Sequence, residues 1–74
     1  MTVYRVIDII GTSPTSWEDA AKDALTTARQ SLRHLRVAEV AEFDIALNDA
    51  GEIDQYRTKL KVSFKYQGDD LPGK

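Results

Sequence analysis

Two acidic side chains, those of Glu42 and Asp44, have the type and spacing of ligands for a hard cation. They stand two residues apart in a segment of alternating polarity, so both project from one face of an extended strand. Calcium takes six to eight oxygen ligands, usually with carboxylates among them. A calcium site would therefore need the same residues from neighbouring subunits around a symmetry axis. The alternative is that Glu42 and Asp44 pair with Lys59 and Arg57 on an adjacent strand.

Asp8 is a third candidate ligand, set in an otherwise apolar, β-branched segment. It could line the same interior as a metal ligand, or it could pair with Arg5 or with a neighbouring subunit, which is the interpretation we favour. The loop from Asn48 to Asp54 also carries several oxygen donors, but it lacks the Asp-x-Asp-x-Asp-Gly spacing of an EF-hand. We interpret that loop as an ordinary hairpin turn.

The residues that could act as nucleophile or base do not form a catalytic set. His34 is the only histidine, and at the end of a predicted helix it is expected to cap the helix or face solvent. Ser13 and Ser16 are explained by helix capping, and one distant histidine is no general base for them. The run Gly11-Thr12-Ser13 could cradle a phosphate at a helix N-terminus, but no second glycine or lysine follows it. We predict a protein that is not an enzyme.

Composition limits the class of protein further. Seventy-four residues make one domain, and a domain this short usually needs support beyond its own core. The chain has no cysteine, which excludes disulfides and thiolate metal sites. Its formal net charge is −2 with both signs mixed, so nucleic-acid binding is not expected. No apolar run approaches the ~20 residues that cross a bilayer, and no signal peptide is evident, which predicts a cytoplasmic protein without a membrane partner.

The first half of the chain predicts a strand followed by a helix. Residues 3–10 are rich in β-branched and aromatic types, which predicts a strand that ends at Gly11. The helix that follows has either Ser13 or Ser16 as its N-cap. Its apolar positions recur every three or four residues as far as about Arg33. Many of them are alanines, and such small side chains let a helix approach a sheet closely.

The second half predicts a β-hairpin. Residues 37–47 and 53–66 alternate in polarity, and a turn at residues 48–52 joins them. The element order is β-α-β-β, an α+β fold in which a three-stranded antiparallel sheet wraps around one long helix. Both hairpin strands must turn an apolar side toward the helix, so the numbers of opposed residues should sum to about 101. The predicted pairs are Phe43 with Thr58 and Ile45 with Tyr56 toward the helix, and Asp44 with Arg57 and Glu42 with Lys59 on the other face.

The face of the sheet away from the helix is a second reason to expect self-association. It is predicted to carry paired charges together with Val40 and Ala46. The edges of a three-stranded sheet also leave backbone groups unpaired, which invites contact with another chain. We expect an oligomer of identical subunits, but these patterns do not determine its symmetry.

Several segments, taken in order over residues 3–66, resemble the dodecin family. No single segment is specific, but the succession covers nearly the whole chain. The segments are Val6-Ile7-Asp8-Ile9-Ile10-Gly11-Thr12-Ser13, the alanine-rich helix with Ala28-Arg29, Leu32-Arg33-His34-Leu35, Ala38-Glu39-Val40 and Leu60-Lys61-Val62-Ser63-Phe64.

The resemblance implies a subunit of a hollow shell, a homododecamer whose sheets face inward and whose helices face outward. Many dodecins hold flavin, as FMN or riboflavin, between a tryptophan after the helix and a glutamine on the last strand. The matching positions here are Val37 and Arg57. Valine offers no ring for stacking, and a guanidinium donates hydrogen bonds but cannot accept them as an amide does. Weak or no flavin binding is therefore expected.

Dodecins without that tryptophan include members, similar to this chain, that are described as calcium-binding. Our preferred hypothesis is non-catalytic binding or storage of a metal ion such as calcium, with Glu42, Asp44 and Asp8 as ligands. The alternative is storage of flavin or coenzyme A in the same shell. The dodecin-like domain is predicted to span residues 1–66, followed by a flexible C-terminal tail over residues 67–74.

Overall fold

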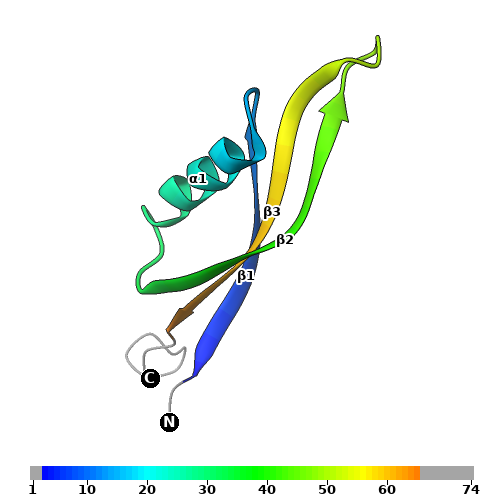
Figure 1. Ribbon diagram of the computed structural model, residues 1–74. Coiled ribbons are helices and arrows are strands. Elements are labelled where there is room, and N and C mark those ends of the chain that lie inside the picture. Colours follow the sequence, from blue (N-terminus) through cyan, green and yellow to red (C-terminus); the bar gives the residue numbers. More distant parts are fainter. Residues whose placement is uncertain (1–2, 66–74) are drawn as a thin grey trace.

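The computed structural model describes residues 3–65 as three antiparallel strands and one helix. The elements are β1 (Tyr4–Ser13), α1 (Trp17–Ala28), β2 (Leu35–Leu47) and β3 (Ile53–Lys65). The sheet order is β1-β3-β2, and α1 lies across one face of it (Figure 1). The predicted β-α-β-β order and three-stranded antiparallel sheet are confirmed. The tail predicted at residues 67–74, and the first and last residues of the predicted domain, lie outside the described residues.

The first strand is longer than predicted, because Gly11 does not end it. The strand continues to Ser13, and Gly11 pairs with Thr58 on β3. A side chain at Gly11 would collide with the carbonyl oxygen of Ala20 and lie 2.8 Å from the Cβ of Ala24. The glycine is required for close approach of α1 to the sheet rather than for a turn.

The helix begins at the second of its two candidate caps. The Ser16 hydroxyl accepts a hydrogen bond from the backbone N–H of Asp19, at 3.0 Å, and so satisfies one free donor of the first turn. The helix then ends at Ala28, earlier than the predicted end near Arg33. Strand β2 begins at Leu35, so the chain has to leave the helix early to reach the edge of the sheet.

The core lies between the alanine face of α1 and the middle of β3. Leu60 and Val62 are almost fully buried, and so is the hydroxyl-bearing Thr58. The prediction that small helical side chains allow close packing is confirmed. The buried helical residues are Ala20, Ala24 and Ala28, and the partly buried residues around the core are Ile7, Ile9, Ala21, Leu25 and Leu35.

The predicted register of the hairpin is confirmed for residues 42–46 of β2 and wrong on both sides of them, since the pairing shifts again between Ala46 and Leu47 at the tip. The four predicted pairs, from Phe43 with Thr58 to Glu42 with Lys59, are all present. A bulge between Val40 and Glu42 then shifts the pairing by one residue. As a result Val40 lies opposite the buried Leu60 on the helix side, and not on the charged face where we expected it. The bulge lets β2 turn apolar residues toward the helix along both halves.

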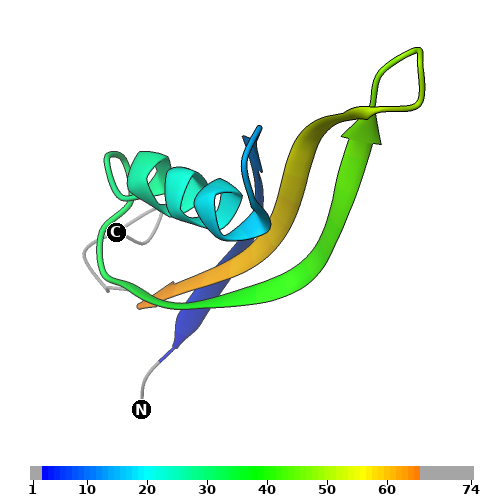
Figure 2. The same ribbon diagram turned by 45° about the horizontal axis from the view of Figure 1, so that its top comes forward.

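The hairpin of β2 and β3 extends well past the start of α1 (Figure 2). Its apolar side chains near the tip are uncovered, with Leu47 59% and Ile53 53% exposed. Other large apolar side chains are exposed along the sheet, namely Val3, Tyr4, Val6, Ile10, Val37, Val40, Phe43 and Ile45. Within residues 3–65, the single helix is too short and too polar to cross a bilayer.

Candidate functional site

The face of the sheet away from α1 carries the candidate metal ligands, and we call it the outer face. Side chains of directly paired residues project from the same face of a sheet, so the register assigns them. Because Leu60 and Val62 face the helix, the residues that alternate with them face outward. The outer face includes Val6, Asp8, Ile10 and Thr12 on β1, Arg57, Lys59 and Lys61 on β3, and Glu39, Glu42 and Asp44 on β2.

Asp44 and Arg57 form a two-point ion pair on this face. The Nε and one terminal nitrogen of Arg57 donate to the two carboxylate oxygens of Asp44, at 2.7 and 3.1 Å. The side chains are 45% (Arg57) and 56% (Asp44) exposed, so solvent screens the pair. The hydrogen bonds from Arg57 lower the pKa of Asp44 below its ordinary value of 3.8, and they outweigh the opposing effect of desolvation; the charge of Arg57 adds a smaller lowering. Asp44 is therefore ionised and already holds a cation, the guanidinium.

The other two candidate ligands also face lysines. Glu42 lies opposite Lys59, and Asp8 lies opposite Lys61, which has Glu39 as its neighbour on β2. Within the described part of the chain, no three acidic or histidine side chains come together in a group that could hold a metal ion. The outer face of one subunit thus places Glu42 and Asp44 side by side but does not assemble a calcium site by itself.

The positions that match the flavin pocket of the resembling family lie far apart in the subunit. Val37 is opposite Ser63, near one end of the sheet, whereas Arg57 is opposite Asp44, toward the hairpin tip. Ser63 and Arg57 are six residues apart on β3, which corresponds to about 20 Å along an extended strand. Val37 and Arg57 could share one pocket only if they came from different subunits.

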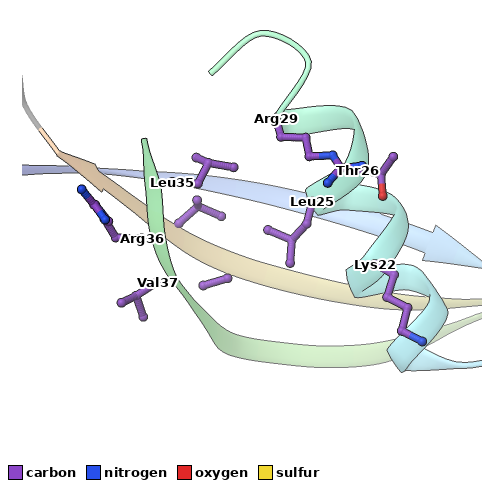
Figure 3. A pocket seen from close by; sticks show the side chains of 9 residues that line it. Lys22, Leu25, Thr26, Arg29, Leu35, Arg36 and Val37 are labelled. Carbon is purple, nitrogen blue, oxygen red and sulfur yellow. The ribbon is translucent and has the colours of Figure 1, made fainter. Parts of the chain in front are cut away.

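A groove of about 500 Å³ lies between α1 and the start of β2. Leu25, Leu35 and Val62 are apolar residues of its lining. Figure 3 shows Leu25 on α1 and Leu35 on β2 on opposite sides of the groove, with Lys22 and Arg29 on the helical side. Its remaining lining residues are Lys22, Thr26, Arg29, Arg36, Val37 and Ala38. Our sequence reasoning missed this groove. A signal for it was present, because four of its lining residues recur at three- and four-residue spacing on one helical face: Lys22, Leu25, Thr26 and Arg29.

Trp17 is a second feature that sequence reasoning missed. It begins α1 and packs between Phe43, with ring centroids 5.1 Å apart, and Tyr56, at 5.2 Å in an edge-to-face arrangement. The hydroxyl of Thr58 also donates to the Trp17 carbonyl, at 2.9 Å. The cluster holds the helix start against the hairpin. The predicted placement of Phe43 and Tyr56 on the helix side was a usable signal for it.

The remaining sequence candidates have structural roles. Ser13 is buried, and its hydroxyl accepts hydrogen bonds from the backbone N–H groups of Thr15 and Ser16, which leaves it no clear role in a phosphate cradle. His34 is exposed and adopts a left-handed backbone conformation with φ of 60°. Of the two expected roles, the exposed one holds: because α1 ends at Ala28, His34 lies in the connection before β2 and does not cap the helix.

A family model described as Dodecin matches residues 3–67. The chain belongs to the dodecin family. The resemblance seen in the sequence is thus confirmed, and the β-α-β-β subunit described above is the dodecin fold of this chain.

Two curated relatives cover most of this dodecin. Calcium dodecin of Mycobacterium tuberculosis is 62% identical over 65 residues, which cover 88% of this chain and 90% of the relative. Dodecin of Thermus thermophilus is 37% identical over 65 residues, which cover 88% of this chain and 93% of the relative.

Solved structures agree with the dodecin fold. The crystal structure of calcium dodecin from Mycobacterium tuberculosis, described as a calcium-chelating immunodominant antigen with a novel calcium-binding site, has a TM-score of 0.79. The two chains are 56% identical, and the match covers 93% of this chain and 97% of the calcium dodecin chain. Dodecin from Streptomyces davaonensis has a TM-score of 0.82 at 38% identity, covering 89% of this chain and 96% of that one.

Proposed function

We propose that this dodecin is a non-catalytic, homo-oligomeric binding protein that takes up calcium on its outer sheet face. The observation that carries the proposal is the 62% identity to a calcium dodecin over most of both chains. The ligands that we propose are Glu42 and Asp44, with Asp8 further along the same face. We propose a hollow shell of twelve subunits in the cytoplasm. In this shell the outer face of each sheet, which is the face away from α1, lines the interior.

The exposed apolar surface supports an assembly of subunits. Val6 and Ile10 on the outer face are 56% and 55% exposed, and each lies on β1, a free edge strand. A stable monomer would leave these side chains and the edge of β1 in water. Burying them between subunits also gives a chain without disulfides the stability that its small core does not supply.

Charge balance supports a calcium site made by several subunits and not by one. In a single subunit the carboxylates of Glu42 and Asp44 face the cations of Lys59 and Arg57, so the four charges cancel. Calcium needs six to eight oxygen ligands and an excess of negative charge. Around a symmetry axis, carboxylates from two or three subunits would approach one ion, and Asp44 would exchange the guanidinium of Arg57 for calcium.

The proposal is tested by titrating the assembled protein with calcium. Calorimetry and mass spectrometry under native conditions measure the binding. Glu42→Gln and Asp44→Asn are each expected to weaken calcium binding at least about tenfold, since each removes one charged ligand from the ion. Glu18→Gln, an exposed acid in the first turn of α1, is the matched control and is expected to leave calcium binding unchanged. Unchanged affinity in both ligand variants would overturn the assignment.

The same preparation separates calcium binding from storage of flavin or coenzyme A. With Val37 and Arg57 at the positions of the family's flavin contacts, we expect a colourless protein that does not quench added riboflavin. A yellow preparation with quenched flavin fluorescence would favour the flavin alternative. A bound mass equal to coenzyme A in the native spectrum would favour that ligand.

A further inference from the structure

Trp17 ties helix α1 to the strand that carries two of the proposed calcium ligands. Its indole N–H donates a hydrogen bond of 3.0 Å to the backbone carbonyl oxygen of Asp44. Helix α1 packs mainly on β1 and β3 and not on β2. Among residues 3–65, the indole bond is the one hydrogen bond that joins α1 to β2. The position of the Asp44 backbone relative to the helix therefore depends largely on this side chain.

Asp44 lies in the middle of a short regular segment of β2. The segment is bounded by two shifts in register, one between Val40 and Glu42 and the other between Ala46 and Leu47. Strand β2 is also an edge strand, paired with β3 on one side only. Bulges bend a strand and change the aim of its side chains, so the ladder alone constrains this segment weakly. A bond from outside the sheet adds a fixed point at Asp44.

The indole is itself held in place on the helix side of the hairpin. Its rings pack against Phe43, at a centroid distance of 5.1 Å, and against Tyr56, at 5.2 Å. Phe43 directly precedes Asp44 in β2, and Tyr56 lies opposite the residue that follows Asp44. The backbone of Trp17 is also held, since its carbonyl oxygen accepts a 2.9 Å bond from the buried Thr58 hydroxyl. A donor fixed in this way can fix its acceptor.

The backbone position of Asp44 decides where its carboxylate lies. Only two rotatable bonds join an aspartate carboxylate to its backbone, so a displaced strand carries the carboxylate with it. Calcium takes its oxygen ligands at about 2.3–2.6 Å, which leaves a tolerance of a few tenths of an ångström. Groups behind the direct ligands of a metal ion orient those ligands, and their loss typically lowers metal affinity about 10–100-fold. If several subunits share one ion, the loss acts in every copy.

We propose that Trp17 is a positioning residue for the calcium ligand Asp44, and that it holds the strand where the carboxylate can meet the ion. This role rests on the proposed function, because it concerns the same site. Trp17 does not itself touch the ion. Its effect on calcium affinity passes through Asp44 and is separate from its contribution to folding.

The test separates the hydrogen bond from ring packing by replacing Trp17, the only tryptophan of the chain, with benzothienylalanine. This amino acid keeps the two-ring shape and carries sulfur in place of the indole N–H. Calorimetric titration of the assembled protein with calcium alone is expected to show about tenfold weaker binding, the lower end of the range for groups behind a metal ligand. Trp17→Phe also lacks the donor and is expected to lose at least as much affinity.

Ala24→Gly is the matched control for general loosening of the helix. Ala24 is buried on the same helix, about two turns from Trp17. Glycine weakens a helix at an interior position, while the indole bond to Asp44 stays in place. This variant should lower the midpoint of thermal unfolding and leave calcium affinity unchanged.

A double-mutant cycle links the effect to Asp44. In an Asp44→Ala background, Trp17→Phe should weaken calcium binding no further, because no carboxylate is left at this position to be placed. In an Asp8→Asn background, Trp17→Phe should still cost about tenfold, since Asp8 lies on β1 and not on the strand that the indole holds. A purely structural role of Trp17 would give the same loss in both backgrounds.

The outcomes separate this role from the proposed function. Unchanged calcium affinity in the benzothienylalanine protein would refute the positioning role and leave calcium binding standing. An equal loss of affinity in Ala24→Gly would also refute it, since loosening of the helix would then be the cause. A further loss in the Asp44→Ala background would show that Trp17 acts through another residue. An unmodified, assembled protein that binds no calcium would refute the proposed function and, with it, the role of Trp17.

Discussion

The indole N–H of Trp17 donates a hydrogen bond of 3.0 Å to the backbone carbonyl oxygen of Asp44. Trp17, the first residue of α1, thus holds the backbone of β2 at Asp44. The Asp44 side chain lies on the opposite face of the sheet and forms the ion pair with Arg57. The link matters because β2 is an edge strand at this point, with a bulge only three positions away. The helix start and the candidate metal ligand are mechanically connected through one side chain.

Replacement of Trp17 by Phe is expected to lower the free energy of unfolding by about 1–2 kcal/mol, through loss of the indole hydrogen bond and of part of the ring contact. Phe43→Leu is the comparison, because it removes a ring contact and leaves the indole hydrogen bond in place. Both are measured by thermal unfolding at one fixed subunit concentration, since an oligomer's stability depends on concentration. Equal stability of Trp17→Phe and the unmodified chain would mean that the hydrogen bond to Asp44 contributes nothing.

Gly11→Ala is expected to destabilise the subunit by about 3 kcal/mol, the upper range for overpacking, because the new methyl group meets the backbone of α1 and not a movable side chain. Combining it with Ala24→Gly should not restore stability, since the collision with the Ala20 carbonyl remains. Gly51→Ala is the matched control. Its methyl group would enter open space, and it should cost only about 1 kcal/mol for the left-handed backbone at φ of 81°.

The sequence was sufficient for the element order and for the hairpin register near Asp44 and Arg57. Both follow from the two-residue period of strands, which allows one arrangement that buries the apolar side and pairs the charges. The bulge at Val40 was not predicted, although the sequence carries a signal for it: Glu39 and Glu42 both lie on the outer face but are three residues apart, so strict alternation breaks between them. The bulge arises from the need to keep apolar residues on the helix side of a strongly bent strand, which is a property of the packed sheet.

The helix end and the groove were also beyond sequence reasoning, for a related reason. Helical spacing continues to Leu32, but Leu35 has to pair opposite Phe64, and that tertiary requirement ends α1 at Ala28. The early exit leaves Leu25 and Arg29 facing the start of β2 and so creates the groove. The candidate ligands Glu42, Asp44 and Asp8 were placed on one face, but whether they meet around an axis depends on contacts between chains.

His34 offers a test of the turn between α1 and β2. Its left-handed backbone costs a non-glycine residue about 1–2 kcal/mol, so His34→Gly should keep or raise stability by up to about 1 kcal/mol, while His34→Val should lower it by at least about 1 kcal/mol. At Arg36, an exposed strand position, the order should reverse, with the glycine variant less stable than the valine variant. The same order at both positions in chemical unfolding would show that the conformation of His34 carries no strain.

The Asp44–Arg57 pair predicts a specific pH dependence. Arg57 lowers the pKa of Asp44 in the folded chain below the ordinary value of 3.8, so folding favours the ionised carboxylate. The stabilisation is complete well above pH 3.8, from about pH 5, and is lost as the pH falls through the lowered pKa. Asp44→Asn should therefore flatten the stability profile only in this acidic range, as followed by denaturant unfolding between pH 3 and 7. A difference in slope near pH 6 would point to another group.

The ion pair also predicts that removing the positive charge of Arg57 will strengthen calcium binding. If Asp44 is a calcium ligand, the guanidinium of Arg57 competes with the ion, so Arg57→Gln should strengthen calcium binding by about tenfold. This is the effect in water of removing one unit charge about 6 Å from a divalent ion. Arg57→Lys keeps the charge but loses the two-point contact, so its effect should be smaller. Arg36→Gln removes a charge from the groove and should leave calcium affinity unchanged. Weaker calcium binding in Arg57→Gln, measured by calorimetry on the assembled protein, would mean that the pair supports the fold of the hairpin and that Asp44 does not bind the ion.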